Sequence, residues 1–242
     1  MKKEYNIISK EYLLLAKQDI FVSKILLKEK VYNLAIFHLS QAVEKITKSY
    51  CLTKTLDGVN PLFNFKELKK FHNPLDLLLD LIKKYMQYYN YKSSPLYEEI
   101  KFKLKKQKET IKKINGRESY KRIKKQIDFL ENLENLDIEK IAKENYNINP
   151  LSKEQLDQIK LNLRSFKEFL PLSLLGAITF RHYLSTRYPY ETVDKKGEII
   201  SNIKFREYKK GLGVVDALEE LIKLTETTLQ NFLETFKEKV KI

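Results

Sequence analysis

Apolar residues recur every three or four positions along nearly the whole chain of 242 residues. No stretch alternates convincingly between apolar and polar residues. A spacing near 3.6 residues is the period of an α-helix, whereas a half-buried strand repeats every two residues. Only six Gly and six Pro are present, so few positions interrupt a helix. The sequence therefore predicts an all-α fold.

Two long helices are predicted at the start of the chain, from about Tyr5 to Glu29 and from about Val31 to Lys54. The apolar face of the first is expected to include Tyr12, Leu15, Ile20 and Ile25. That of the second is expected to include Leu34, Phe37, Val43 and Ile46. Further on, Asn73 followed by Pro74 has the pattern of an N-cap and a first helical residue, and predicts the start of another helix.

Three helices are predicted in the last third of the chain. We expect Pro171 to break the chain between a helix ending near Phe169 and an apolar helix from Leu172 to Thr186. Small residues in the apolar helix permit close helix packing, namely Ser173, Gly176 and Ala177. A final helix is predicted from Val214 to about Val240. The longest apolar run, residues 171–180, is too short to span a membrane.

The middle of the chain has a different pattern. Apolar residues alternate at steps of three and four on both sides of Asn115-Gly116, which predicts two helices joined by a tight turn. Residues 101–125 contain twelve Lys or Arg and only two acids. This segment therefore supplies most of the formal net charge of +14 of the chain. So few acids cannot neutralise the block by pairing along a helix, and a polyanion is the expected partner.

The nucleic-acid-binding residues predicted on this hairpin are Lys105, Lys112, Lys113, Arg117, Lys121 and Arg122. Tyrosines just before the block offer rings on which bases can stack. Two other readings stay open: a solvated lysine-rich surface, and contact with a membrane surface or an acidic protein. The single cysteine, Cys51, excludes an internal disulfide and favours an intracellular protein.

The nine residues from Arg181 to Pro189 place three cationic or polar side chains near the end of the apolar helix: Arg181, His182 and Arg187. Two arginines can hold a phosphate through bidentate hydrogen bonds. Arg187 could equally tie the helix end to the body of the protein. The three histidines of the chain form no metal-binding pattern, and neither a metal nor a cofactor is expected.

Several of these residues carry a resemblance to a known family. They are Asp19 in the first helix, the set His38, Gln41, Ala42, Glu44, Lys45 and Lys48 in the second, His72 with Leu75, and Arg187-Tyr188-Pro189. In this order the chain resembles the HEPN family (higher eukaryotes and prokaryotes nucleotide-binding domain). The resemblance covers about residues 5–83 and 172–240.

The resemblance implies a single domain in the form of an up-and-down helical bundle, and a homodimer. The bundle would comprise about residues 5–92 and 152–240, and the basic hairpin with its acidic return, about residues 94–150, would be an insertion. Simpler roles remain open for the shared polar residues. His38 would be a hydrogen-bonded core residue, His72 a loop or capping group, and Glu44 and Lys45 partners of neighbouring helices or of a second subunit.

Many HEPN proteins resemble metal-independent ribonucleases, whose motif is Arg, a polar residue, and then His after four to six intervening residues. Arg181 and His182 fit the first two positions, but Thr186 stands where the catalytic His is expected. Threonine cannot transfer protons near pH 7 as histidine can. His182 could replace it only from another face, because one residue turns a side chain by about 100° around a helix.

Three functions follow. The first is a cytoplasmic RNA-binding protein of a prokaryotic defence or toxin–antitoxin system, without an intact ribonuclease motif and with a nucleotidyltransferase-type partner protein. The second is a metal-independent endoribonuclease that uses Arg181 and His182 as catalytic residues. The third is a helical protein-interaction module without enzymatic activity, for which the positive charge is incidental.

Overall fold

A computed structural model describes residues 2–56, 60–88, 117–132, 168–180, 182, 192–193, 199–201 and 207–240. The helices there are α1 (Lys2–Lys28), α2 (Tyr32–Leu52), α3 (Phe65–Lys69), α4 (Pro74–Tyr88), α6 (Arg117–Asn132), α9 (Gly213–Asp216), α10 (Leu218–Val240) and the helical residues 168–180. The all-α prediction is confirmed. The first arm of the predicted hairpin and its acidic return lie outside the described residues.

Two short antiparallel ladders depart from the purely helical expectation. One pairs β1 (Thr55–Leu56) with β2 (Asn60–Pro61), and the other pairs β3 (Thr192–Val193) with β4 (Ile199–Ser201). Each strand has only two or three residues, which is too short to leave an alternating pattern in the sequence. Both ladders lie in connections between helices.

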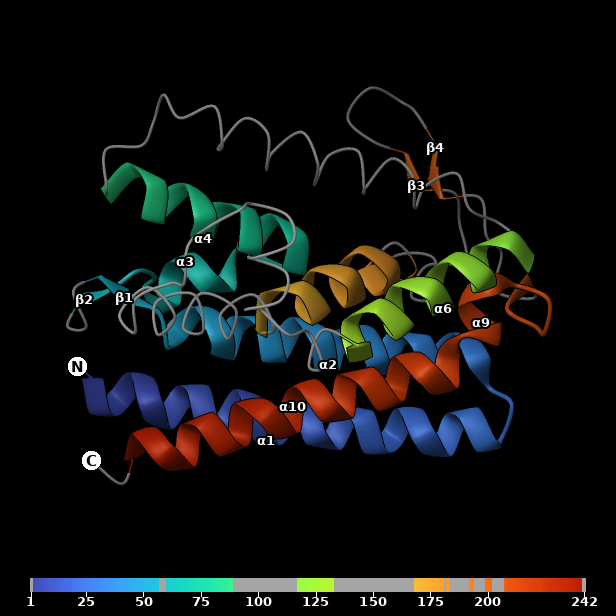
Figure 1. Cartoon of the computed structure of the whole chain (residues 1–242), viewed down its shortest axis with the longest axis horizontal. Helices are drawn as coiled ribbons and strands as arrows, with labels where there is room; N and C mark the ends of the chain where they lie inside the picture. Colours follow the sequence, from blue (N-terminus) through green and yellow to red (C-terminus); the bar gives the residue numbers. More distant parts are fainter. Residues whose placement is uncertain are drawn as a thin grey trace, which may run out of the picture.

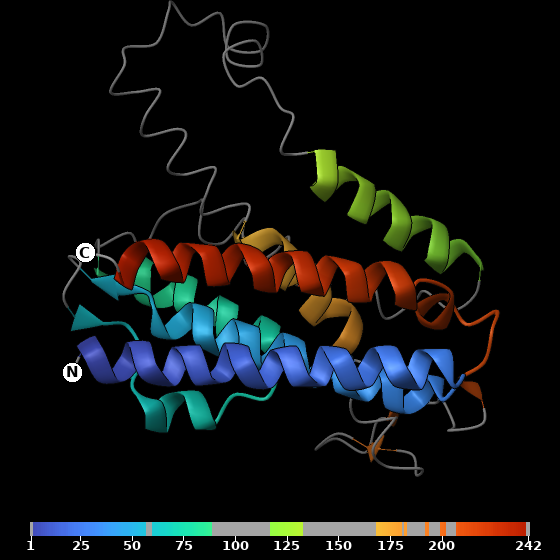
Figure 2. The same cartoon turned by 90° about the horizontal axis from the view of Figure 1, so that it is seen from below.

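The two longest N-terminal helices pack against each other along their length, and α10 lies beside α1 (Figures 1 and 2). A tight turn makes α1 and α2 antiparallel. Lys30 adopts a left-handed conformation, with φ of 59°, and the N–H of Val31 donates to the carbonyl of Leu26 at 2.8 Å. This is the Schellman way of ending a helix, which usually employs glycine at the position of Lys30. The predicted ends of both helices lie within three residues of the observed ones.

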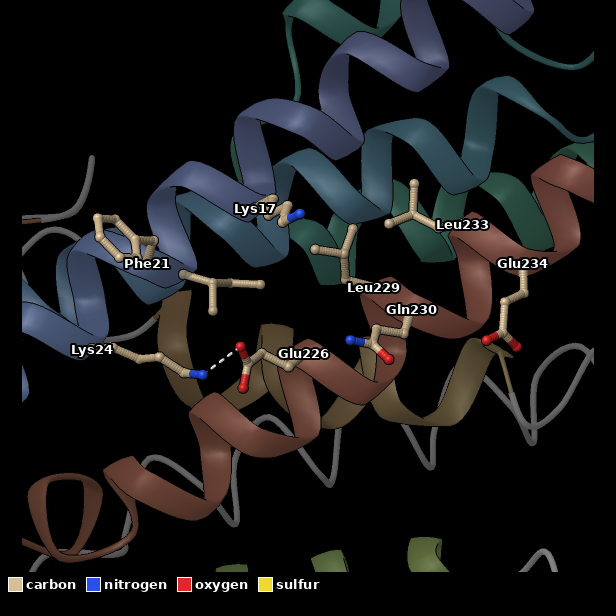
Figure 3. A pocket seen from close by; sticks show the side chains of 9 residues that line it. Lys17, Phe21, Lys24, Glu226, Leu229, Gln230, Leu233 and Glu234 are labelled. Carbon is tan, nitrogen blue, oxygen red and sulfur yellow. Dashed lines mark hydrogen bonds and ion pairs between the residues drawn. The ribbon is translucent and has the colours of Figure 1, made fainter.

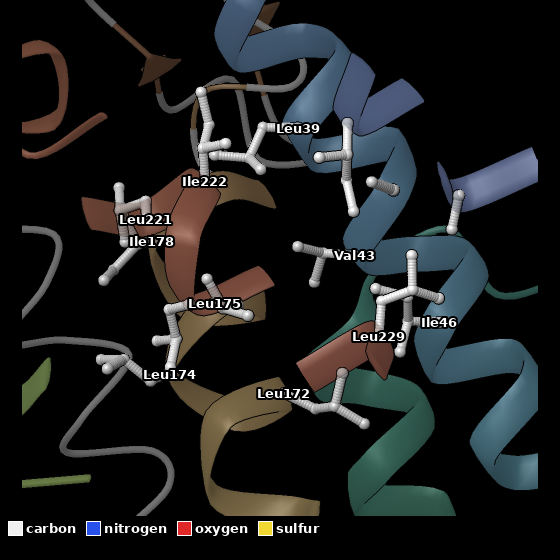
Figure 4. Close-up of a cluster of buried hydrophobic side chains, with 14 of the residues drawn as sticks. Leu39, Val43, Ile46, Leu172, Leu174, Leu175, Ile178, Leu221, Ile222 and Leu229 are labelled. Carbon is white, nitrogen blue, oxygen red and sulfur yellow. The ribbon is translucent and has the colours of Figure 1, made fainter. Parts of the chain in front are cut away.

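The core lies between α2, α10 and the helical residues 168–180 (Figure 4). Side chains exposed by 4% or less come from all three, including Val43 and Ile46 from α2, Leu172, Leu175 and Ile178, and Leu221 and Leu229 from α10. The close approach predicted for the small residues is confirmed at Gly176. A Cβ atom there would lie 2.9 Å from the Cβ of Pro74, so only glycine fits without a shift of α4.

Some predicted details are wrong. Leu15, Ile25 and Leu34 were expected on apolar inner faces, yet each is at least 40% exposed. Pro171 does not break the chain, because residues 168–180 are helical on both sides of it. Proline removes only one N–H donor, and the buried leucines that follow it hold the helix in place. The last helix is divided at Ala217, although hydrogen bonds to and from Ala217 continue the helical pattern across the division.

The predicted start of α4 is confirmed. Helix α4 begins at Pro74, and the side-chain oxygen of Asn73 accepts a hydrogen bond from the N–H of Leu75 at 3.1 Å. A second helix start has a full capping box, in which Asn64 and Glu67 each accept from the other's backbone N–H at 2.9 Å. No described helix is long and apolar enough to cross a membrane.

Candidate functional site

A cluster of charged side chains joins α1 to α2 around Asp19. One carboxylate oxygen of Asp19 lies 3.0 Å from Nδ1 of His38, and the other accepts a hydrogen bond from Nζ of Lys45 at 2.5 Å. The Asp19 side chain is 16% exposed. His38 and Lys45 are seven residues apart on α2, two helical turns, so both face α1. Asp19 is therefore the acceptor that ties the two helices together at this level.

A second cluster surrounds Glu44, one residue before Lys45. Its carboxylate accepts from Nζ of Lys48 at 2.6 Å and lies 3.5 Å from Nδ1 of His72. The side chains of Glu44 and Lys48 are 13% and 8% exposed, whereas His72 is 63% exposed. His72 lies in the loop before α4, as expected. The contact places this loop against α2.

The two clusters are balanced in charge. Each carboxylate has one lysine and one histidine as partners, so neither cluster has a surplus that would attract an anion when the histidines are neutral. Tyr12 lies on the same side of α1, and burial together with the charge of Glu44 raises its pKa. Among the described residues, no group of three or more His, Cys, Asp or Glu side chains could hold a metal ion. These contacts are suited to holding helices together.

His182 is buried, with 8% of its surface exposed. Its Nδ1 lies 3.1 Å from the hydroxyl of Tyr208, and the two rings meet edge to face with centroids 5.7 Å apart. Tyr208 is itself 6% exposed. A general acid or base has to reach the proton that it transfers. The contact with Tyr208 engages one nitrogen of His182 and orients the ring.

Helix α6 carries exposed lysines on one side and is attached to the body by the other. Ile123 and Ile127 are buried in the core cluster, and the hydroxyl of Tyr120 donates to Glu220 of α10 at 3.0 Å. Lys121, Lys124 and Lys125 are exposed. No ion pair of theirs occurs among the residues that the structure describes. In contrast, the lysines of the two clusters on α2 each pair with a carboxylate.

Comparison with protein families gives one match. The HEPN domain model matches residues 9–133, slightly more than half of the chain. The chain belongs to the HEPN family. No match is found among curated proteins or among solved structures. HEPN membership suggests nucleic-acid binding or a ribonuclease-like function.

The HEPN match includes most of α1 and the whole of α2, α4 and α6, and therefore both charged clusters and the exposed lysines of α6. The sequence selected Asp19, His38 and Lys45 by their resemblance to the family, and the structure brings these three into contact. It likewise joins Glu44, Lys48 and His72. Lys45 pairs with the neighbouring helix α1, as the simpler interpretation expects, whereas Glu44 pairs with Lys48 of its own helix and with His72 in the loop before α4.

The predicted nucleic-acid-binding and catalytic residues are only partly visible. Lys121 is exposed on α6, as expected, and Arg117 and Arg122 lie on the same helix. The side chains of these two arginines are outside the described residues, as are Lys105, Lys112, Lys113, Arg181, Thr186 and Arg187. Of the residues from Arg181 to Pro189, the structure therefore describes His182.

Sequence reasoning missed a groove of about 410 Å³ between α1 and α10 (Figure 3). Ile20, Leu229 and Leu233 line it, and Phe21 lies at its edge. Charged side chains border it, with Lys17 and Lys24 on α1 and Glu226 and Glu234 on α10. Lys24 and Glu226 meet across it at 2.5 Å. No single helix signals such a groove, because its two sides are about 200 residues apart in the chain.

Proposed function

We propose that this HEPN protein binds RNA through the basic surface that includes α6, and that it does not cleave RNA with Arg181 and His182. The observation that carries the proposal is the exposed trio Lys121, Lys124 and Lys125 without ion-pair partners among the described residues. Tyr120, Ile123 and Ile127 attach α6 to the body by its other side, so the lysines belong to a surface held in a fixed position.

Charge density supports RNA over a neutral partner. The three lysines belong to the block of twelve cations and two acids in residues 101–125. Like charges at this density repel one another, and a bound polyanion would offset that repulsion. A nucleic acid offers one phosphate per nucleotide, and binding releases the counterions condensed around it. RNA affinity should therefore fall steeply as salt rises.

The absence of cleavage is proposed from two observations. Thr186 replaces the histidine of the ribonuclease motif. His182, the remaining histidine of that segment, is buried against Tyr208. Neither residue is then suited to remove the proton of a ribose 2′-hydroxyl near pH 7. Binding without cleavage is the expected behaviour.

We further propose a cytoplasmic role in a prokaryotic defence or toxin–antitoxin system, alongside a nucleotidyltransferase-type partner protein. The support is the resemblance in the arrangement of the HEPN motifs. An adjacent nucleotidyltransferase gene would agree with this setting, and co-purification of the two proteins would test it directly. Separate genomic locations and no co-purification would contradict it.

Fluorescence anisotropy with a labelled single-stranded RNA, measured across a salt series, tests RNA binding. For the unmodified protein, the logarithm of affinity should fall with the logarithm of salt by about 0.7 per phosphate contact. Exchanging Lys121, Lys124 and Lys125 for Gln should flatten that slope by up to about 2, because three contacts are lost. The matched control exchanges Lys66, Lys69 and Lys70, which are exposed on and just after α3. Equal slopes in both variants would contradict the proposal.

Cleavage is tested with the same RNA in EDTA, followed by gel electrophoresis. We expect intact RNA with the unmodified protein and with the variants Arg181→Ala and His182→Ala. Cleavage by the unmodified protein that both variants abolish would instead establish the endoribonuclease. No measurable RNA affinity near physiological salt would leave the protein-interaction module as the function.

A further inference from the structure

Two exposed lysines lie on the loop that precedes α9. Lys209 and Lys210 make no ion pair with any other residue that the structure describes. The family match does not include them, because it ends at residue 133. Nothing in the sequence distinguishes them either, since lysines are mostly exposed on protein surfaces. Their significance depends on where the fold places the loop.

The fold places this loop near the start of α6. Helix α9 follows the loop directly, and α6 packs against α9 at one end of the bundle (Figures 1 and 2). The hydroxyl of Tyr120 donates to Glu220, which lies near the start of α10 and four residues after the end of α9. Lys121 follows Tyr120 in the chain. The first exposed lysine of α6 is therefore at the end of that helix nearest to the loop.

Backbone hydrogen bonds give the loop a defined shape. Tyr208, just before it, is buried, with 6% of its surface exposed. The N–H of Leu212 donates to the carbonyl of Lys209 at 3.1 Å, and the N–H of Gly211 donates to the carboxylate of Asp216 at 2.9 Å. Gly211 has a φ of 96°, a conformation that other residues rarely adopt. The two lysines are thus held between a buried tyrosine and the last residue of α9.

The acidic side chains around the loop have other contacts. The carboxylate of Asp216 accepts from the loop backbone, and that of Glu220 accepts from Tyr120. Glu207 has an interaction of its own. Glu219 is exposed near the start of α10, and a single carboxylate does not balance two lysines. The loop therefore adds positive charge to the end of the bundle where the cationic side of α6 begins.

We propose that Lys209 and Lys210 bind RNA phosphates next to those bound by α6, so that one RNA strand crosses from α6 onto the loop before α9. This inference rests on the RNA binding proposed for α6 and extends it to a second element. Lysine binds phosphate as a point charge, and such contacts position a strand without reading its sequence. Tyr208 joins the loop to His182, so the strand passes from α6 toward the part of the fold that holds His182.

Fluorescence anisotropy over a salt series, with a labelled single-stranded RNA and the full-length chain, tests the extension. Exchanging Lys209 and Lys210 for Gln should weaken binding by about fivefold and flatten the salt slope by up to about 1.4, because two phosphate contacts are lost. Exchanging the same two for Arg keeps the charge and should preserve the slope. The matched control exchanges Lys10 and Lys17 for Gln. Both are exposed on α1 and form no ion pair within the described structure, so this control should bind RNA normally.

Chemical footprinting locates the bound strand without any substitution. An amine-reactive ester acetylates accessible lysines, and mass spectrometry measures the extent at each position. Bound RNA should protect Lys209 and Lys210 together with the exposed lysines of α6. It should leave Lys10 and Lys17 as reactive as they are in the free protein.

The outcomes separate this inference from the proposal for α6. A loop variant with an unchanged slope and no protection of the loop lysines, beside an α6 variant with a flattened slope, would overturn the extension and leave RNA binding by α6 intact. Unchanged slopes in both variants would contradict RNA binding by α6 as well. Equal flattening in the Lys10 and Lys17 control would show that any exposed lysine contributes, and would also overturn the extension.

Discussion

Charged side chains have different surroundings in two parts of this molecule. Between α1 and α2, Asp19 binds both His38 and Lys45 and is 16% exposed. On α6, Lys121, Lys124 and Lys125 are exposed and have no ion pair among the described residues. The difference shows why net charge alone does not locate a binding surface. Charged side chains that are buried and paired hold helices together. The surplus positive charge lies on exposed side chains instead.

The same contrast separates the family resemblance from the proposed function. Of the residues that carry the HEPN pattern on α2, His38, Glu44, Lys45 and Lys48 pair with other residues of the protein. The RNA-binding proposal depends on α6, whose lysines have no such role in the described structure. Four predictions test the contrast, in order of decreasing effect.

Asp19→Ala should lower the free energy of unfolding by about 2 kcal/mol, because His38 and Lys45 lose a shared and mostly buried acceptor. Urea unfolding near pH 7 measures the change. Glu29→Ala, at an exposed acid after the end of α1, is the control and should change stability by less than about 0.5 kcal/mol. Equal effects in the two variants would show that the Asp19 cluster is not structural.

Exchanging Lys121, Lys124 and Lys125 for Gln should weaken RNA binding and leave the stability of the protein nearly unchanged. RNA affinity should fall by about tenfold, or about 1.4 kcal/mol, while the unfolding free energy stays within about 0.5 kcal/mol of its original value. Asp19→Ala, if still folded, should bind RNA normally. A lysine variant that loses stability but keeps its affinity for RNA would contradict the assignment of RNA binding to α6.

Tyr120 anchors α6, and its phenol can be followed through its titration. Its hydrogen bond to Glu220, together with the charge of that carboxylate, raises the pKa of the hydroxyl. A raised pKa of an acid means that the neutral form is stabilised by folding. The contribution is therefore present below about pH 10, the ordinary value, and is lost as pH rises through the folded pKa. The melting temperature of Tyr120→Phe should lie below that of the unmodified protein at pH 7, and the two should converge at high pH.

Glu67 should have the smallest effect, because its side chain is 39% exposed. The backbone N–H of Asn64, and then Lys84, lower its pKa. Its stabilisation is thus present above about pH 4.3, the ordinary value, and is lost as pH falls through the folded pKa. Glu67→Gln should cost less than about 1 kcal/mol at pH 7, and progressively less as pH falls through the folded pKa of Glu67. An effect as large as that of Asp19→Ala would contradict the distinction between buried and exposed charges.

Much of the helical arrangement could be predicted from the sequence. Periodicity located α1, α2 and α10, and Asn73-Pro74 located the start of α4, because these signals act within one or two helical turns. Orientation was less certain where a helix is apolar on more than one side. On α1, Leu15 and Ile25 are 44% and 45% exposed, whereas Leu13 and Ala16 are buried. Which side faces inward depended on α2 and α10, and not on α1 alone.

The candidate site was predicted in part. The resemblance to the family selected Asp19, His38 and Lys45. Their contact, however, depends on the register in which α1 packs along α2. The sequence placed His182 beside Arg181 in a cationic segment. It could not show that His182 is buried next to Tyr208, which follows twenty-six residues later in the chain. The groove beside Phe21 was also missed, because α10 forms half of it.

The sequence by itself determined that the chain is helical, where most helices begin, and that the positive charge is concentrated in one block. These properties are local, since they depend on residue identity and on spacing within a few turns. Tertiary structure decided which charges are paired, that His182 is buried, and which side of α1 remains exposed. Those properties depend on contacts between helices that are distant in sequence, and packing fixes them only once the bundle has formed.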